Sequence, residues 1–433
     1  MRTIPTILLG ITFMTTTLSA APANLDARID AAASRVAPHV IEMRRDIHQH
    51  PELGNREVRT AKLVADRLHE LGIDTKTGIA HTGVVGLLRG GKPGGVVALR
   101  ADMDALPVVE QVDVPFKSTV RTTFDGHDVG VMHACGHDAH VAILLGVAEV
   151  LSGMRQEIPG TVKFIFQPAE EGAPAGEEGG AALMVKEGVL EDPKVSAVFG
   201  LHVTSRYEVG ELAYRVEGMM AAVDSFTIKV RGKQTHGAYP WLGVDPIVVA
   251  SQIILGLQTI ESRQLDSSMA PSIITVGAIH GGVRNNIIPD EVEMIGTIRS
   301  LETGMRDEIH QRIRKTAENI AIAAGATATV TITTGYPITF NDRALTEASA
   351  PTLRRLAGND HVTVVNPVLG AEDFSFYQQK VPGLFFFVGT RPKGVSAADA
   401  ASNHSPLFYV DESGLELGVR ALSHLAVDYL SKK

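Results

Sequence analysis

Residues that bind metals or transfer protons gather in a few short segments of this 433-residue chain. These segments supply one cysteine, three histidines and two adjacent glutamates: Cys135, His137, His202, His404, Glu170 and Glu171. Thiolate, imidazole and carboxylate groups together are the donor set of transition-metal sites. One such residue alone is weak evidence, so the prediction of a metal centre depends on whether the fold brings them together.

The predicted strands place these residues at one edge of one sheet. Short β-branched runs at 96–99, 162–166, 197–201 and 384–388 have the length and composition of buried strands. Ligands in open α/β sheets bind beyond the carboxyl ends of the strands. The loops after these runs contain Asp102, Asp104, Glu170, Glu171, His202 and His404, and the loop before a helix predicted at 139–151 contains Cys135 and His137.

Cys135 is the only cysteine of the chain, and two kinds of chemistry would explain it. A metal-bound thiolate is deprotonated and shielded from oxidation. The alternative is a nucleophile activated by His137, although a nucleophile and its base usually come from different segments. A spacing of two residues suits two ligands of one metal better, so we favour the metal.

Strands alternating with helices predict an α/β fold with a doubly wound, mostly parallel sheet. The segment 223–334 differs, because its pattern reads β-α-β-β-α-β, the order of ferredoxin-like domains. Helices are expected there at 246–262 and 306–324, with strands at 226–230, 272–278, 291–299 and 328–333. We therefore predict a catalytic domain formed by 24–222 and 335–433 with a smaller inserted domain between them.

The first 23 residues have the three parts of a secretory signal. Arg2 precedes a largely apolar stretch at 4–18, and Ala21-Pro22-Ala23 fits a cleavage site. We expect an exported protein, periplasmic or secreted. The net charge of −9 argues against a nucleic-acid or anionic-membrane partner, and no later apolar stretch is long enough for a membrane span.

The motifs follow one another as they do in a known family. They are HQHPE (48–52), RADMDALP (100–107), MHACGHDAH (132–140), QPAEEG (167–172), GKQTHGA (232–238), NNIIPD (285–290) and GAEDF (370–374). The chain resembles the dinuclear metallopeptidases that include aminoacylase, carboxypeptidase G and peptidase T. It is most similar to their amidohydrolase branch, which contains hippurate hydrolase, N-acetyldiaminopimelate deacetylase and the auxin–amino acid conjugate hydrolases.

The resemblance implies two divalent metal ions per subunit, zinc or manganese, with cobalt or nickel as further options. The implied ligands are Cys135, His137, Glu171, His202 and His404. Glu170 would be the general base and later the general acid. Where the wider family has a His-x-Asp motif, this chain has Asp102-x-Asp104, which leaves the ligand set of one metal open.

The inserted domain is implied to form a homodimer, or a higher oligomer of dimers, and to carry a catalytic histidine. That histidine, His236, would stabilise the oxyanion in the partner's site. Asn286 and Arg299 are candidates for binding the substrate carboxylate, although Arg299 could equally be an exposed charge at a strand end. Asp104, Glu372 and Asp373 could orient the ligand histidines.

The predicted activity is hydrolysis of the amide bond of N-acyl-L-amino acids, such as hippurate-like or acetyl-amino acid substrates. An exported metallo-carboxypeptidase or dipeptidase with the same site is a second hypothesis. A periplasmic small-molecule binding protein is a third, but a pure binder would not need a Glu-Glu pair beside a Cys-Gly-His site. An inactive relative is a fourth, which the presence of every catalytic position argues against.

Overall fold

The structure, a computed structural model, describes residues 24–432, so the predicted signal peptide lies outside the described residues. A central sheet has eight strands in the order β1-β2-β6-β3-β7-β18-β8-β17. The strands are β1 (Asp74–Ile79), β2 (Gly83–Arg89), β3 (Lys92–Asp102), β6 (Pro159–Gln167), β7 (Ala197–Glu208), β8 (Leu212–Tyr214), β17 (Val362–Val364) and β18 (Gly383–Arg391). The four adjacent strands β6, β3, β7 and β18 are parallel, which confirms the mostly parallel sheet.

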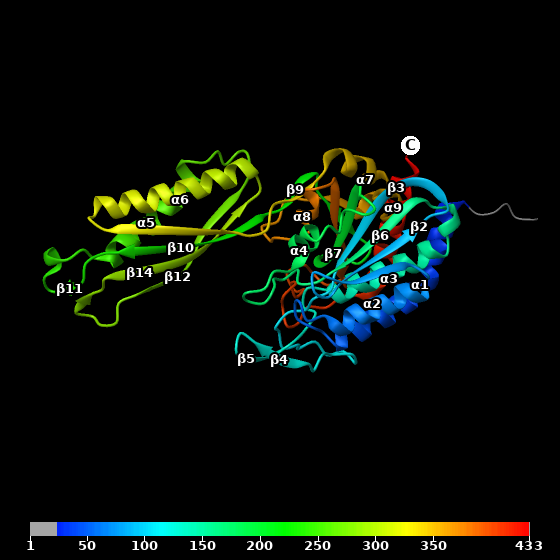
Figure 1. Cartoon of the computed structure of the whole chain (residues 1–433), viewed down its shortest axis with the longest axis horizontal. Coiled ribbons are helices and arrows are strands. Elements are labelled where there is room, and N and C mark those ends of the chain that lie inside the picture. Colours follow the sequence, from blue (N-terminus) through cyan, green and yellow to red (C-terminus); the bar gives the residue numbers. More distant parts are fainter. Residues whose placement is uncertain (1–23, 433) are drawn as a thin grey trace, which may run out of the picture.

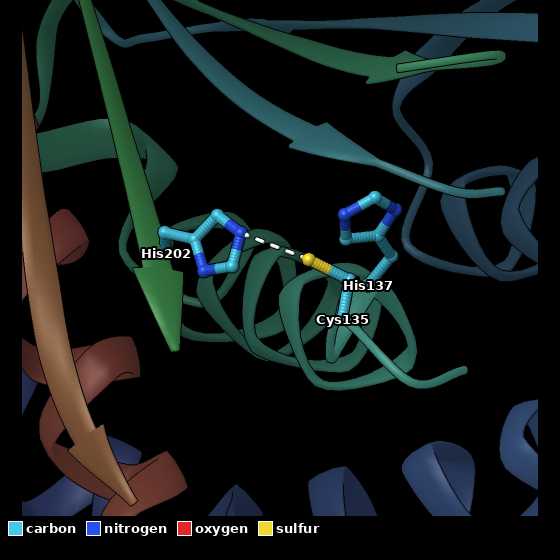
Figure 2. A group of neighbouring side chains, drawn as sticks. All are labelled: Cys135, His137 and His202. Carbon is cyan, nitrogen blue, oxygen red and sulfur yellow. Dashed lines mark hydrogen bonds between the residues drawn. The ribbon is translucent and has the colours of Figure 1, made fainter. Parts of the chain in front are cut away.

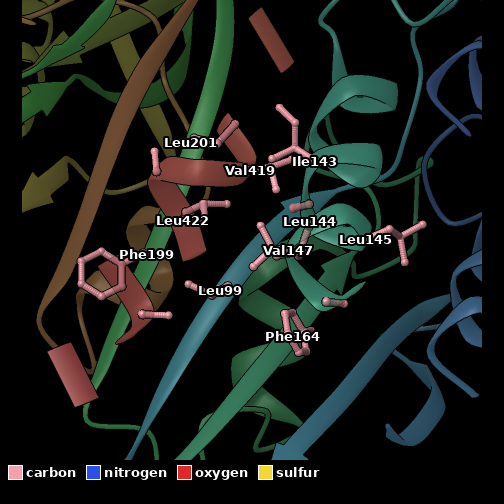
Figure 3. Packing of buried hydrophobic residues seen from close by; sticks show 14 of the residues in the cluster. Leu99, Ile143, Leu144, Leu145, Val147, Phe164, Phe199, Leu201, Val419 and Leu422 are labelled. Atoms are coloured by element: carbon pink, nitrogen blue, oxygen red, sulfur yellow. The ribbon is translucent and has the colours of Figure 1, made fainter. Parts of the chain in front are cut away.

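Successive side chains along each strand point to opposite faces of the sheet, so the core has two layers. On β3, Leu99 faces one layer and Ala98 the other. The larger layer is formed by α1 (Leu25–Gln49), α2 (Val58–Glu70), α3 (His137–Ser152), α7 (Arg343–Ala357) and α9 (Leu415–Ser431). In Figure 3, Ile143 and Val147 of α3 and Val419 of α9 pack toward this face of the sheet. The other face is covered by α4 (Gly180–Lys186) and α8 (Ser375–Gln378).

Several short elements were not predicted from the sequence. Helix α7 lies in a segment for which no helix was predicted, and it contains Pro351 in its interior. The other additions are the short 3-10 turns and the strands β1, β4 (Arg121–Phe124), β5 (His127–Gly130), β8, β9 (Glu217–Met220), β11 (Thr235–His236), β13 (Ile287–Ile288) and β16 (Thr339–Asn341), with helices α4 and α8. Strands of two to four residues are too short to show periodicity, which explains most of these omissions.

A second sheet contains four antiparallel strands in the order β12-β14-β10-β15. In chain order the unit is β10 (Ala222–Arg231), α5 (Pro246–Arg263), β12 (Ser272–Gly281), β14 (Glu291–Ser300), α6 (Thr303–Ala323) and β15 (Thr327–Thr334). This is the predicted β-α-β-β-α-β order, with both helices on one face over a separate core. Figure 1 shows this unit beside the large sheet, with β11 at its far end. Its role in dimerisation stays a prediction.

The chain enters and leaves this unit through two adjacent segments. The backbone N–H of Val223 donates to Tyr336 O, and that of Gly335 donates to Val223 O, both at 3.1 Å. Asp224 is buried here and accepts hydrogen bonds from Arg306 and the Gly335 amide. Within residues 24–432, no helix is both long enough and apolar enough to cross a membrane.

Candidate metal centre

The predicted metal ligands meet beyond the carboxyl ends of the parallel strands. Cys135 Sγ lies 3.3 Å from His202 Nε2, and His137 lies beside them in Figure 2. His404 Nε2 lies 3.1 Å from Glu171 Oε1, which is 4.0 Å from His137 Nε2. The structure therefore gathers all five predicted ligands into one cluster of sulfur, nitrogen and oxygen donors.

Local backbone conformations point Cys135 and His137 at this cluster. Gly136 between them has a φ of 95°, which favours glycine. A Cβ at this position would lie 2.3 Å from a methyl carbon of Val203. The helix α3 then begins at His137, so its ring sits on the first helical turn.

Hydrogen bonds connect the loop that carries His404 to the turn that contains Cys135 and His137. The His404 amide donates to Ala134 O at 2.8 Å, and its own backbone has a left-handed φ of 71°. The Asn403 side-chain amide donates to the carbonyls of Cys135 and Val203 at 3.0 and 3.1 Å. These contacts join a segment near the C-terminus to the Cys-Gly-His turn.

Hydrogen bonds fix which ring nitrogen of each ligand histidine faces the cluster. His137 Nδ1 donates to Asp104, 2.9 Å from its carbonyl oxygen and 3.3 Å from its carboxylate. His137 Nε2 is buried and has no hydrogen-bond partner among residues 24–432. His202 Nδ1 donates to Val203 O at 2.7 Å, which leaves its Nε2 facing Cys135. A buried nitrogen without a partner and a sulfur beside it fit a bound divalent cation.

His140 and Asp102 lie next to the cluster, but both already have partners. His140 Nδ1 donates to Asp102 at 2.6 Å, and its Nε2 accepts the Val203 amide at 2.8 Å. The Asp102 carboxylate also accepts from Arg100 at 2.5 Å. Neither ring nitrogen of His140 is free for a metal, and Asp102 serves to hold Arg100 and His140.

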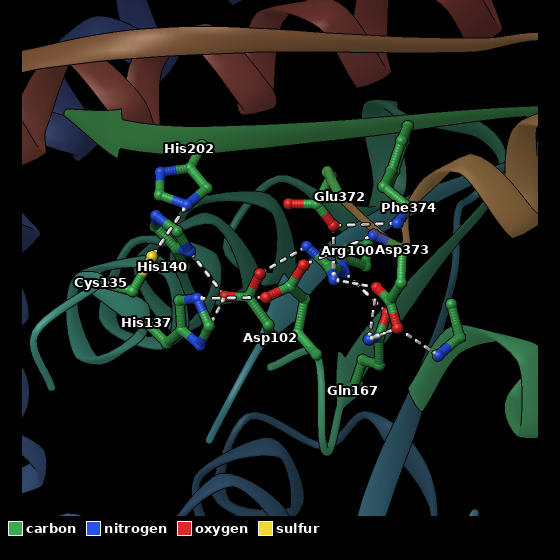
Figure 4. Close-up of polar contacts among 12 residues, drawn as sticks. Arg100, Asp102, Cys135, His137, His140, Gln167, His202, Glu372, Asp373 and Phe374 are labelled. Carbon is green, nitrogen blue, oxygen red and sulfur yellow. Dashed lines mark hydrogen bonds and ion pairs between the residues drawn. The ribbon is translucent and has the colours of Figure 1, made fainter. Parts of the chain in front are cut away.

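Glu372 and Asp373 surround Arg100 in Figure 4, rather than a ligand histidine. The fully buried guanidinium lies 3.0 Å from Glu372 and 2.8 Å from Asp373, and it also bonds Gln167 at 2.8 Å. The expectation that they orient ligand histidines therefore receives no support from the contacts of the described residues. Of the three candidate carboxylates, Asp104 alone has a hydrogen bond to a ligand histidine there.

The adjacent glutamates occupy a turn that is held from two sides. The Asp104 carboxylate accepts the backbone amides of Glu170 and Glu171 at 3.0 and 2.9 Å. On the other side, the Tyr336 hydroxyl donates to Glu170 O at 2.6 Å. Sequence reasoning missed Tyr336, because an isolated tyrosine after a strand gives no signal of this contact.

The electrostatics of the cluster favour a metal ligand over a thiol nucleophile. Burial and the Glu171 carboxylate raise the pKa of Cys135 well above its usual range. Burial also lowers the pKa of His202 well below its usual range, so the thiol has no imidazolium partner. A bound divalent cation would instead stabilise the thiolate.

Two further groups of the centre with shifted pKa values are Glu170 and His137. Burial and the neighbouring carboxylates of Glu372 and Glu171 raise the pKa of Glu170 well above its usual range. Burial lowers the pKa of His137, but Asp102 and Asp104 outweigh that effect and raise it to about 10. Divalent cations would offset this excess of negative charge.

A cavity of about 480 Å³ opens onto the cluster. Its wall includes Glu170, Arg299 and a second arginine, Arg206, which sequence reasoning missed. Among the described residues, the two guanidinium groups form no ion pair with a carboxylate. Arg206 lies four residues after His202 on β7, and that position was the available signal.

His236 and Asn286 lie together, but away from this cavity. Gly237 N donates to Asn286 O at 2.8 Å, and β11 pairs with β13 beside them. Both residues are exposed, and β11 stands at the far end of the smaller unit in Figure 1. Neither belongs to the wall of the cavity in its own chain.

Known proteins share this fold and much of this sequence. The model of peptidase family M20/M25/M40 matches residues 98–428. The chain is 44% identical over 395 residues to thermostable carboxypeptidase 2 of Saccharolobus solfataricus, covering 91% of this chain and 96% of that protein. It is 41% identical over 395 residues to IAA-amino acid hydrolase ILR1-like 4 of Arabidopsis thaliana, covering 90% and 86%.

A solved structure supports the same family assignment. The crystal structure of the Bacillus subtilis YXEP protein, described as a dinuclear metal-binding peptidase of the M20 family, superposes with a TM-score of 0.77. It is 35% identical, and the match covers 92% of this chain and 100% of that one. The chain is therefore a metal-dependent amidohydrolase of the M20/M25/M40 peptidase family.

Proposed function

We propose that the protein hydrolyses the amide bond of N-acyl-L-amino acids to a carboxylic acid and a free amino acid. The observation that supports this most directly is the cavity shared by Glu170, Arg299 and four of the five predicted ligands, Cys135, Glu171, His202 and His404. A proton-transfer group, a cation site and a carboxylate receptor are the three requirements for cleaving an amide next to a carboxylate.

The ligands Cys135, His137, Glu171, His202 and His404 would hold two divalent ions, zinc or manganese. When bound, such ions supply Lewis-acid activation of water and of the amide carbonyl. Glu170 then accepts a proton from the attacking water and later gives it to the leaving amine as the C–N bond breaks. Glu171 cannot take this part, because coordination would keep it ionised and occupied.

Arg299 is the proposed receptor for the substrate carboxylate. A guanidinium without an ion-pair partner can bind a carboxylate through two parallel hydrogen bonds. Asn286 and His236 are too far from the cavity of their own chain to act there. We therefore propose that the protein is a homodimer in which His236 of the partner subunit stabilises the oxyanion.

A carboxypeptidase or dipeptidase is the second candidate function, supported by the 44% identity to thermostable carboxypeptidase 2. Purified protein reconstituted with zinc, manganese, cobalt or nickel separates the two. We expect faster turnover of acetyl-, benzoyl- or indoleacetyl-amino acids than of dipeptides with a free amine. Faster cleavage of the dipeptides would favour the second function. Export is tested separately, by cleavage of a leader near residue 23 and recovery from the periplasm or medium.

A further inference from the structure

A second cavity, of about 410 Å³, lies on the other side of Glu171. Its wall comes from the segments 53–56, 104–107 and 171–175 and from the hairpin of β4 and β5. The first cavity is lined instead by residues of 202–206, 299 and 368–404, among others. Glu171 is the one residue that the two walls share. The two cavities therefore adjoin each other at a predicted metal ligand.

Apolar side chains form part of the wall of the second cavity, beside the charged groups of Arg56, Asp104, Asp125 and Glu171. Leu53, Leu106, Pro107 and Pro174 contribute to it, and Phe124 at the end of β4 covers one side. The Phe124 side chain is 38% exposed, although a phenylalanine usually lies in a core. Figure 1 shows the β4–β5 hairpin projecting from the large domain. An apolar cavity of about 150 Å³ is enough to bind benzene, so this one has room for an aromatic group.

The charges around this cavity disfavour a carboxylate. Its one arginine, Arg56, is already paired with Glu177 at 2.5 Å. Asp125, next to Phe124 in the hairpin turn, adds a negative charge at the wall. The first cavity also has carboxylates in its wall, those of Glu170, Glu171 and Glu372, but it adds two arginines, Arg206 and Arg299, that form no ion pair among the described residues. This asymmetry gives a substrate with one charged and one apolar end a single favoured orientation.

We propose that the second cavity binds the acyl group of the substrate and that Phe124 determines acyl specificity. The amino-acid carboxylate then lies in the cavity of Arg206 and Arg299, with the amide bond at the metal ligands between them. The inference rests on the proposed function, and it names the substrate class as amino acids carrying a bulky apolar acyl group, aromatic above all. An acetyl group would leave most of the cavity to water.

The test compares acyl groups on one amino acid. Phe124→Ala removes the aromatic contact at an exposed position, so the variant should fold. We expect kcat/KM for the N-benzoyl substrate to fall about tenfold, while that for the N-acetyl substrate stays within about twofold. Thr122→Ala is the matched control, because Thr122 is exposed on the same strand but does not line the cavity. Its benzoyl-to-acetyl ratio should stay at the wild-type value.

A binding measurement separates this inference from the proposed function. Benzamide is neutral and aromatic, so it probes the cavity without a carboxylate, and calorimetry should show about tenfold weaker binding to Phe124→Ala than to wild type. A wild-type enzyme that hydrolyses no N-acyl amino acid would refute the proposed function. Benzamide binding would still test whether the second cavity binds an aromatic group. Equal benzamide binding in both proteins would overturn the inference, as would an unchanged benzoyl-to-acetyl ratio or an equal loss on both substrates.

Discussion

The carboxylate of Asp104 lies 3.3 Å from His137 Nδ1, and this contact turns the other ring nitrogen toward the metal ligands. The same carboxylate accepts the amides of Glu170 and Glu171. One residue therefore sets the tautomer of a ligand, through this carboxylate and its backbone carbonyl oxygen at 2.9 Å, and its side chain also holds the catalytic turn. Groups that orient a metal ligand in this way are worth about 10–100-fold in metal affinity.

Asp104→Asn should weaken metal binding by about 10–100-fold, because an amide cannot accept from both backbone amides and His137 together. Metal affinity is measured by competition with a chelator of known affinity. Asp113→Asn, at an exposed aspartate, is the control and should keep wild-type affinity. Unchanged affinity in Asp104→Asn would show that the contact does not support the site.

Substitution of the two adjacent glutamates should affect different properties, turnover for Glu170 and metal affinity for Glu171. Glu170→Gln is expected to lose about two to four orders of magnitude in kcat while keeping its metal, because it loses the proton acceptor. Glu171→Gln should lose metal affinity, because it loses a ligand oxygen. Elemental analysis and single-substrate kinetics of both variants check this. Equal metal loss in the two, or near-normal turnover of Glu170→Gln, would contradict the assigned roles.

Activity should require a metal and should not depend on a reactive thiol. A chelator is expected to abolish turnover and added divalent metal to restore it. Cys135 should resist iodoacetamide in the metal-loaded enzyme at pH 7, because its sulfur is coordinated and buried. Mass spectrometry measures the alkylated fraction. Rapid inactivation of the loaded enzyme, with full activity in chelator, would instead support a cysteine nucleophile.

Mixed dimers test whether His236 acts across subunits. His236→Ala should be nearly inactive but keep its metal, since one oxyanion donor contributes about 10²–10³ in kcat. Co-expression with Glu170→Ala gives mixed dimers with one intact site of two. Random pairing makes about half the dimers mixed, so about a quarter of wild-type activity should return. No recovery, in a preparation shown to contain mixed dimers, would refute the shared site and leave the metal chemistry standing.

Asp224 should stabilise the junction between the two sheets in a pH-dependent way. Burial raises its pKa, but hydrogen bonds from Arg306 and the Gly335 amide outweigh that effect and lower the pKa below the usual 3.8. The stabilisation is therefore present above pH 3.8 and is lost as pH falls through the lowered folded-state pKa. Asp224→Asn should cost about 3 kcal/mol at neutral pH, because it leaves Arg306 without its counter-charge.

Denaturant unfolding at several pH values measures this difference. The gap between wild type and Asp224→Asn should shrink progressively below pH 3.8, where the wild-type carboxylate becomes protonated. The exposed Asp307→Asn on the same helix as Arg306 is the control and should show little effect. A gap that stays constant with pH would mean that the carboxylate charge is not the cause.

The main parallel strands, the β-α-β-β-α-β unit and the candidate donors could all be predicted from the amino-acid sequence. Buried strands read as apolar β-branched runs, and residues just after them must lie at the carboxyl edge of the sheet. That rule predicts Glu171, His202 and His404 in one region, and the loop before the helix predicted at 139–151 adds Cys135. It worked because each position depends on local pattern and on the direction of a parallel strand.

Which neighbours compete for each polar group could not be predicted, because those neighbours come from distant parts of the chain. Asp102 and His140 have the right types and positions for ligands, but Arg100 and the Val203 amide already occupy them. Tyr336 touches the Glu170 turn across 166 residues of sequence. The cavity beside Phe124 likewise brings together segments far apart in the chain. A side chain's role depends on the nearest donor or acceptor in space, and spacing along the chain does not encode that distance.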